Sequence, residues 1–267
     1  MSAGYQPDSI NMLVNVGVYR ERGLGEPALA ALIQQDVDAN AGRIKRGEHG
    51  TFSFDVDNGA CGALTGLDVV RGFLTSHAIH VGMVVGSDSA PGPLHVRALP
   101  RPESGAAILL GRDEGVVGLS AVRQRTYPEY AELLEGYWEW VDGAGRFPRR
   151  PGNRLVVLER RGFVDRAAQC AAEVTTDYLD DFGVPTESVD LLVATPGQTF
   201  ADELADLLGI GRERTLHVGE QLGAMHTAQP IAAIDQARRT GRWAAARTIL
   251  LVAAGSGITV TTALYRH

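Results

Sequence analysis

Cys61 is the residue of this chain whose type and position most directly predict covalent chemistry. It stands where the strand-like alternation of residues 52–56 gives way to the helical spacing of apolar positions in residues 64–74. A thiol at a helix N-terminus lies near the positive end of the helix dipole, which favours the thiolate, the form that attacks carbonyl carbon. Gly59 and Gly62 leave room beside it. We interpret Cys61 as a candidate nucleophile; the alternative is a packed thiol, because free cysteine is commonly buried.

His226 is a candidate base, because imidazole titrates near neutral pH and can take a proton from Cys61 or from a substrate hydroxyl. It stands in the segment LGAMHTAQP, at the predicted start of a helix, where a capping or solvent-facing role is the competing interpretation. Cys170 lies in a helical run of small residues, and we interpret it as core packing.

The first half of the chain alternates segments with strand and helix patterns. Strands are predicted at residues 10–18, 52–57 and 80–88, and helices at residues 27–36 and directly after Cys61. Residues 104–114 and 115–124 then predict two strands joined by a polar turn. Such alternation predicts a sheet with helices on its faces.

The second half repeats this order. Helices are predicted at residues 163–182, 198–208 and 228–239, and strands at residues 189–195 and 216–219 and, around a glycine turn, in residues 248–267. Two similar halves predict an internally duplicated α/β fold of five layers, α-β-α-β-α, with halves at residues 1–145 and 155–267. The glycine- and proline-rich segment 143–152 is the predicted boundary.

Composition and charge exclude several classes of function. The chain has 267 residues, 45% of them hydrophobic and 21% charged, as is usual for a soluble globular protein. A formal net charge of −7 argues against nucleic acid or an anionic membrane as the main partner. Two cysteines and no signal-peptide pattern favour the cytoplasm over a disulfide-forming compartment. No apolar stretch is long enough to cross a bilayer, and we expect no metal site.

Two segments together resemble the ketoacyl-acyl-carrier-protein synthase III branch of the thiolase superfamily. The first is FDVDNGACGALTGLDVVRGFL followed by HVGMVVGSD, and the second is the closing segment from residue 234, with its glycine turn. The resemblance extends over nearly the whole chain and implies a thiolase-like duplicated fold. It places Cys61 at the acyl-accepting cysteine. It also implies that the backbone N–H groups of Ser256 and Cys61 form an oxyanion hole.

The resemblance further implies substrates and partners. No bound cofactor is expected, because coenzyme A or phosphopantetheine enters as the substrate thioester. Acyl-CoA or an acyl carrier protein is the expected partner, and a homodimer, or a heterodimer with a related synthase, is the expected assembly. Tyr130, Leu134, Tyr137 and Trp138 have the spacing of one helix face; we interpret them as packing, the alternative being one wall of an acyl-chain tunnel.

The sequence departs from the family pattern at the catalytic histidine and asparagine. An ungapped comparison places Ala-Thr-Pro-Gly, residues 194–197, at the family's His-Gln-Ala-Asn motif, and a shift onto Gln198 restores no histidine. The family's Gly-Asn-Thr corresponds to Gly-Ala-Met at residues 223–225. The family's first strand and the helices before it also have no counterpart, so an incomplete N-terminal half is expected.

Three functions fit these features to different degrees. The first is acyl transfer through a Cys61 thioester, without decarboxylation, in fatty-acid or polyketide-type metabolism. The losses at Ala194 and Ala224 motivate a second, a catalytically impaired partner subunit or scaffold of a complete ketoacyl synthase. The third and least favoured is a hydrolase or thiolase-like variant that uses His226.

Overall fold

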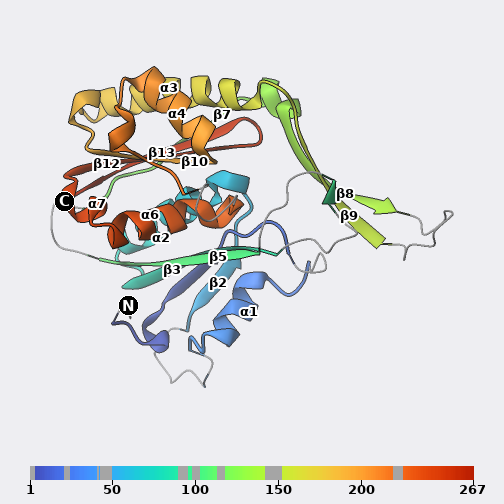
Figure 1. Cartoon of the computed structure of the whole chain (residues 1–267). Helices are drawn as coiled ribbons and strands as arrows, with labels where there is room; N and C mark the ends of the chain where they lie inside the picture. The colour runs from blue at the N-terminus through green and yellow to red at the C-terminus, as the bar shows by residue number, and fades with distance from the viewer. Residues whose placement is uncertain are drawn as a thin grey trace.

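Five layers of helices and sheets build the molecule, as predicted (Figure 1). The computed structural model describes residues 4–20, 25–40, 42, 50–89, 96–97, 103–112, 118–141, 152–218 and 225–267. Helix α1 forms one outer layer, α2 and α6 form the central layer, and α3 and α4 form the other outer layer, with a sheet on each side of the centre (Figure 1).

The first sheet has the strand order β2-β1-β3-β5. Its strands are β1 (Met12–Asn15), β2 (Phe52–Asp55), β3 (Val81–Asp88) and β5 (Ser104–Gly111), and its helices are α1 (Leu29–Asp36) and α2 (Gly62–Thr75). Strand β1 pairs in parallel with both β2 and β3, and β5 is antiparallel to β3. Every residue of β1 is buried, as is typical of a central parallel strand covered on both faces.

The second sheet lies between the central helices and the outer pair α3 and α4. Its strands are β11 (Thr215–Leu216), β10 (Leu191–Thr195), β12 (Thr248–Gly255), β13 (Thr259–Arg266), β6 (Gly118–Leu119) and β7 (Arg123–Thr126). Its helices are α3 (Phe163–Asp181), α4 (Gln198–Leu208) and α6 (Gln229–Arg239). The predicted order of the second half is confirmed, including the closing antiparallel pair β12 and β13.

The prediction of a hairpin in residues 104–124 is wrong. Strand β5 pairs with β3 in the first sheet, whereas β6 and β7 pair with β13 in the second. An isolated two-stranded hairpin is only marginally stable. Each strand is stabilised more by backbone hydrogen bonds to the edge of a larger sheet. Part of the segment predicted as the first half therefore completes the second sheet. The predicted boundary itself, residues 143–152, lies almost entirely outside the described residues.

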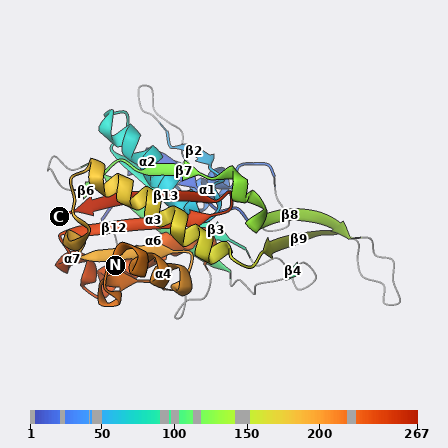
Figure 2. The same ribbon diagram turned by 90° about the horizontal axis from the view of Figure 1, so that it is seen from above.

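The prediction of a helix through the aromatic segment is also wrong. A short 3-10 turn, Pro128–Leu133, leads into β8 (Leu134–Val141), which pairs with β9 (Gly152–Glu159); β4 (Val96–Arg97) completes a third sheet. The β8–β9 pair projects from the layered body (Figure 2). Successive side chains of a strand point to opposite faces, so Tyr137 and Trp138 do not share a face. Both are exposed.

The remaining elements are short. They are the 3-10 turns η1 (Pro7–Ser9), η3 (Gly59–Cys61), η5 (Thr186–Ser188), η6 (Arg212–Arg214) and η7 (His226–Ala228), and the helix α7 (Arg242–Ala245). No helix among the described residues is both long enough and apolar enough to cross a membrane.

Two large apolar clusters form the core. One lies between the sheets and contains Cys61 with the buried faces of α2 and α6. The other lies between the second sheet and the outer helices and contains Cys170, which confirms the interpretation of that cysteine as core packing.

Candidate functional site

Cys61 is the last residue of η3 and the N-cap of α2. Gly59, with φ of +49°, makes the left-handed turn that brings the chain from β2 into η3. The Cys61 side chain is completely buried against the second sheet. Its thiol donates hydrogen bonds to the carbonyl oxygens of Thr259 (3.2 Å) and Ala253 (3.5 Å). The strand-to-helix junction predicted from the sequence is therefore present. It places the sulfur against β12 and β13.

The surroundings of Cys61 favour the neutral thiol. Burial raises its pKa to about 12, and the nearby hydroxyl and backbone N–H of Thr261 oppose only part of this rise. The expected stabilisation of the thiolate by the helix N-terminus is thus outweighed in this structure. Desolvation penalises a charge here because the thiol sits between two sheets, a position that local sequence does not reveal.

The turn between β12 and β13 lies directly against the Cys61 turn. A Cβ atom added to Gly255 would be 3.4 Å from the backbone nitrogen of Ala60 and 3.8 Å from that of Cys61. One added to Gly59 would be 3.9 Å from the Ser256 hydroxyl oxygen. The structure therefore brings together Cys61 and the Ser256 turn. However, the Cys61 N–H donates to the Asn58 carbonyl (3.0 Å), so one of the two implied oxyanion-hole donors is engaged within η3.

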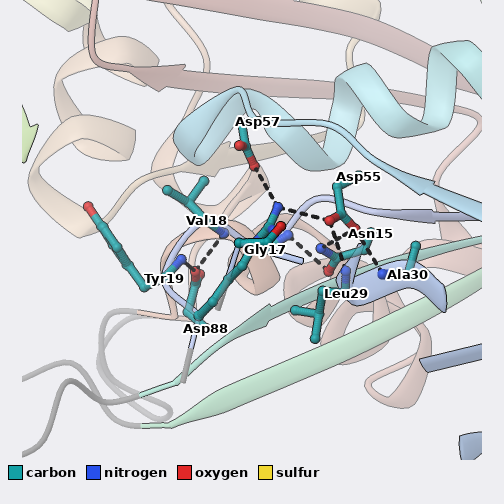
Figure 3. A network of polar contacts seen from close by, with 11 residues as sticks. Asn15, Gly17, Val18, Tyr19, Leu29, Ala30, Asp55, Asp57 and Asp88 are labelled. Carbon is teal, nitrogen blue, oxygen red and sulfur yellow. Dashed lines mark hydrogen bonds and ion pairs between the residues drawn. The ribbon is translucent and has the colours of Figure 1, made fainter. Parts of the chain in front are cut away.

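Asp88, at the carboxyl end of β3, is the centre of a second cluster. Its Oδ1 accepts the backbone N–H groups of Val18 (3.0 Å) and Tyr19 (2.8 Å), as Figure 3 shows. Its Oδ2 accepts the backbone N–H (3.1 Å) and the hydroxyl (2.6 Å) of Thr227 and lies 3.1 Å from Nδ1 of His226. This one carboxylate joins the segment after β1 to the η7 turn.

The same contacts keep Asp88 ionised. Burial by itself would raise its pKa, but the hydrogen bonds and charge of His226 and the hydrogen bonds from Thr227 and Tyr19 outweigh it and lower the pKa to about 2. Sequence reasoning did not single out Asp88. The available signal was an acidic residue at the end of an otherwise apolar strand.

His226 begins η7, directly before α6, as predicted. Its backbone is left-handed, with φ of +46°, and its ring stacks on Tyr19 with centroids 4.8 Å apart. The η7 turn packs against η3, so His226 and Cys61 lie on contacting turns. His226 is half-buried and paired with Asp88 rather than solvent-facing. Its side chain is thereby held in one orientation beside the candidate nucleophile's turn.

An open pocket of about 480 Å³ adjoins the Asp88 cluster. Most of its lining residues are polar in type, but apolar atoms make up the larger part of its wall. Cys61 does not contribute to it; the lining residues are Tyr19, Arg20, Leu29, Ser87, Asp88, Ser89, Glu103, Ser104 and Gly105. The pocket lies where the segment after β1 meets the ends of β3 and β5, on the first-sheet side of the candidate site.

Asp55 binds both the start of α1 and Arg20, which belongs to the segment after β1. Its carboxylate accepts the backbone N–H groups of Leu29 (2.9 Å) and Ala30 (2.8 Å), which are otherwise unsatisfied at the start of α1 (Figure 3). The side chain of Asn15 also donates to it (3.1 Å), and Arg20 forms a 2.9 Å ion pair with it. Asp55 therefore fixes α1 relative to the pocket wall that contains Arg20.

The residues at the expected histidine position face opposite sides of the second sheet. Ala194 belongs to the outer apolar cluster, away from Cys61. Its neighbour Thr195 alternates to the other face, is buried, and has a hydroxyl with no hydrogen-bond partner among the described residues. Residues 223 and 224, at the expected asparagine position, lie outside the described residues. The described residues also contain no cluster of histidine, cysteine and acidic side chains that could hold a metal ion.

Comparisons with known proteins agree with this architecture. A family model for the C-terminal region of 3-oxoacyl-[acyl-carrier-protein] synthase III matches residues 179–267. The β-ketoacyl-[acyl-carrier-protein] synthase III of Acidiphilium cryptum is 23% identical over 277 residues, covering 99% of this chain and 79% of the relative.

Solved structures share the fold at low identity. A 3-oxoacyl-[acyl-carrier-protein] synthase III from Aquifex aeolicus superposes with a TM-score of 0.78 at 19% identity, covering 99% of this chain and 80% of that one. OleA from Xanthomonas campestris, with bound lauric acid and lauroyl-CoA, superposes with a TM-score of 0.77 at 18% identity, covering 99% and 78%.

Proposed function

We propose that this chain, a ketoacyl-acyl-carrier-protein synthase III-like protein of the thiolase superfamily, transfers an acyl group through a thioester on Cys61. The sulfur of Cys61 bonds to the acyl carbon of an acyl-CoA or acyl-carrier thioester, and the donor's carbon–sulfur bond breaks. The donor leaves as a free thiol and takes up the proton that Cys61 loses. An acceptor then attacks the new thioester and releases Cys61.

The observation that carries this proposal is the meeting of Cys61 with the Ser256 turn. Cys61 is the N-cap of α2, and the turn that contains Ser256 packs against it and against Ala60. A donor aimed at the developing oxyanion lowers the barrier of acyl transfer by about 3 kcal/mol in other enzymes. The Ser256 N–H is the donor that we propose. Names of relatives that act as acyl-carrier-protein synthases, and the lauroyl-CoA bound by OleA, support the substrate class.

We propose that the reaction stops short of decarboxylative condensation. That reaction passes through an enolate, which the family stabilises with a histidine and an asparagine. Residues 194–197 and 223–225 contain neither. The expected setting is still fatty-acid or polyketide-type metabolism, in the cytoplasm, where an acyl group must be loaded before or after chain elongation.

His226 is the proposed base for the acceptor. Because the Asp88 carboxylate is ionised and lies against Nδ1, it favours the tautomer with the proton on Nδ1 and leaves Nε2 as the acceptor of a proton in the neutral ring. We expect His226→Gln to slow release of the acyl group while leaving Cys61 acylation intact. Loss of acylation in this variant would instead place His226 in the first half-reaction.

Two observations favour a second candidate function, a scaffold that pairs with a complete synthase. Cys61 has a raised pKa, and its backbone N–H is already bonded to Asn58. A subunit of that kind would have the same fold and would bind a carrier protein or a synthase, but it would never form an acyl adduct. Either function fits a homodimer or a heterodimer with a related synthase, built through the first sheet.

Intact-mass spectrometry after incubation with a panel of acyl-CoA thioesters tests the proposal. We expect a mass increase equal to one acyl group in the wild-type protein and none in Cys61→Ala. Cys170→Ala is the matched control, since Cys170 is the other buried free cysteine of the chain and should leave the adduct unchanged. No adduct with any chain length would overturn acyl transfer and support the scaffold.

A malonyl-carrier assay tests the limit on the chemistry. We expect no β-ketoacyl product from acyl-CoA and malonyl carrier even when the Cys61 adduct forms. A product formed at the rate of an ordinary synthase would contradict the non-decarboxylative assignment.

A further inference from the structure

Two buried threonines flank the place where the Cys61 thiol meets the second sheet. In the register of that sheet, Thr195 of β10 is opposite Ala253 of β12, and Ala253 is opposite Thr261 of β13. The Cys61 thiol donates to the carbonyl oxygen of Ala253, the middle residue of this row. The thiol also donates to the carbonyl oxygen of Thr259, two residues before Thr261 on β13, and hydrogen bonds from Thr261 act to lower the pKa of the thiol.

The alternation of the strands places both threonines on the Cys61 side. In β10, Leu191 and Val193 belong to the apolar cluster that contains Cys61, whereas Ala194 belongs to the outer cluster. Side chains two residues apart share a face, so Thr195 faces the Cys61 side.

The same reasoning applies to β13. Ala263 belongs to the Cys61 cluster, whereas Val260 and Leu264 belong to the outer cluster. Thr261 therefore faces Cys61, and its neighbour Thr262 faces the outer helices.

Neither inner hydroxyl has a well-aligned hydrogen-bond partner among the described residues, although Thr195 is 1% exposed and Thr261 is 0% exposed. A buried hydroxyl without a partner is unfavourable, and a valine of the same shape would avoid that cost. A neutral thiol is a weak acceptor, whereas a thiolate is a strong one. While Cys61 carries a proton, the two hydroxyls thus have no strong acceptor within the described ranges of the chain.

We propose that Thr195 and Thr261 are hydrogen-bond donors to the negative charge on the Cys61 sulfur, poised before that charge forms. Each hydroxyl donates a hydrogen bond to the sulfur when the thiolate appears and loses this acceptor when the sulfur is acylated or protonated. Residues 194–197 are the segment in which the family's histidine was expected. Within this segment, Thr195 is on the Cys61 side of the sheet. The inference rests on the proposed function only in that Cys61 reacts as a thiolate.

The rate of Cys61 alkylation by iodoacetamide between pH 7 and pH 10 tests this inference. Peptide mass spectrometry distinguishes modification of Cys61 from that of Cys170. We expect Thr195→Val and Thr261→Val each to slow Cys61 alkylation about tenfold at a given pH, the size of one hydrogen bond to a charged group. Thr195→Ser and Thr261→Ser should restore the rate to within about threefold of wild type.

Thr262→Val is the matched control. Thr262 is on the same strand as Thr261 and is 0% exposed, and its hydroxyl also has no hydrogen-bond partner in the described part of the chain, but it faces away from Cys61. We expect wild-type alkylation from it, and thermal unfolding midpoints should confirm that all variants are folded.

An unchanged rate in either inner valine variant, or an equal loss of rate in Thr262→Val, would overturn the inference. Absence of Cys61 alkylation in the wild-type protein at every pH would also overturn it. If wild-type protein forms the acyl adduct while the valine variants alkylate normally, only this inference fails. If threonine-dependent alkylation occurs without any acyl adduct, the proposed function fails and this inference stands.

Discussion

The thiol of Cys61 and the carboxyl of Asp88 are both buried, yet their surroundings favour opposite charge states. The carbonyl oxygens of Ala253 and Thr259 accept hydrogen bonds from the thiol. They cannot stabilise a thiolate, because a thiolate has no proton to donate. Donors from the segment after β1 and from η7 converge on Asp88, and these stabilise a carboxylate. Burial raises the pKa of both groups; it prevails at Cys61, whereas the donors that converge on Asp88 outweigh it.

The pH dependence of Cys61 alkylation follows from its raised pKa. Since that pKa is about 12, the thiolate fraction should rise about tenfold per pH unit from pH 7 to pH 10 without levelling off. A small free thiol, whose pKa is about 8.5, provides the reference and should level off within this range. Site-resolved alkylation rates measure both, and a plateau for Cys61 below pH 9 would contradict the assignment of a neutral thiol.

Asp88 should make the folded state sensitive to acid. Its pKa is lowered from 3.8 to about 2, so its contribution to stability is complete above pH 4 and is lost as the pH falls through 2. The shift corresponds to about 2 kcal/mol in the free energy of unfolding. Urea unfolding of wild type and Asp88→Asn between pH 2 and pH 6 should show this pH-dependent part only in wild type. Asp57→Asn, at an exposed carboxylate, is the control; equal acid sensitivity in wild type and Asp88→Asn would contradict the prediction.

At the scale of secondary-structure elements, the candidate site depends on how closely η7 approaches β3. Gly86 of β3 has no side chain, and a Cβ atom there would be 2.7 Å from the carbonyl oxygen of Thr227 and 2.9 Å from the Cα of Ala228. Both are backbone atoms, which cannot rotate away. The absence of a side chain at this one strand position therefore allows Asp88 to reach Thr227 and His226.

Gly86→Ala should displace η7 from β3 and weaken the Asp88 cluster. We expect the free energy of unfolding to fall by about 1–3 kcal/mol, the usual cost of overpacking, and His226-dependent turnover to fall with it. Gly105→Ala on the neighbouring strand is the control, because its Cβ would make only ordinary contacts at 3.9 Å. Chemical denaturation and turnover assays check this prediction. Equal stability of the two alanine variants would show that η7 does not pack tightly against Gly86 of β3 in solution.

At the scale of the whole molecule, the first sheet ends in β2 in the described part of the chain. An edge strand presents unpaired N–H and C=O groups, and Phe52 on β2 is 58% exposed. These features suit pairing with a second chain, in line with the dimer that we propose. The outer helices α3 and α4, on the opposite side of the molecule, would remain at the surface of such an assembly (Figure 1).

Light scattering in solution tests the dimer. We expect a mass twice that of one chain for wild type and a monomer for Phe52→Asp, because a charge at this edge opposes strand pairing. Leu207→Asp, at an exposed leucine of α4, should remain dimeric. A monomeric wild-type protein, or a dimer that survives Phe52→Asp, would rule out pairing through β2.

Most helices and central strands could be predicted from the sequence because their patterns are local. The period of apolar residues identifies α2, α3 and α6, and the alternation or continuity of apolar residues identifies β1, β3 and β12. Strand partners are different, since β5 and β6 follow one another in the chain but join separate sheets. Which edge a strand extends depends on the assembled layers, and no window of sequence contains that information.

The sequence by itself determined the layer order, the strand-to-helix junction at Cys61 and the absence of the histidine and asparagine motifs. Only the tertiary structure decided that burial raises the pKa of Cys61, that Asp88 pairs with His226, and that Thr195 rather than Ala194 is on the Cys61 face of the second sheet. These properties arise from desolvation and from hydrogen bonds between residues far apart in the chain. They exist only once both sheets have closed on the central helices.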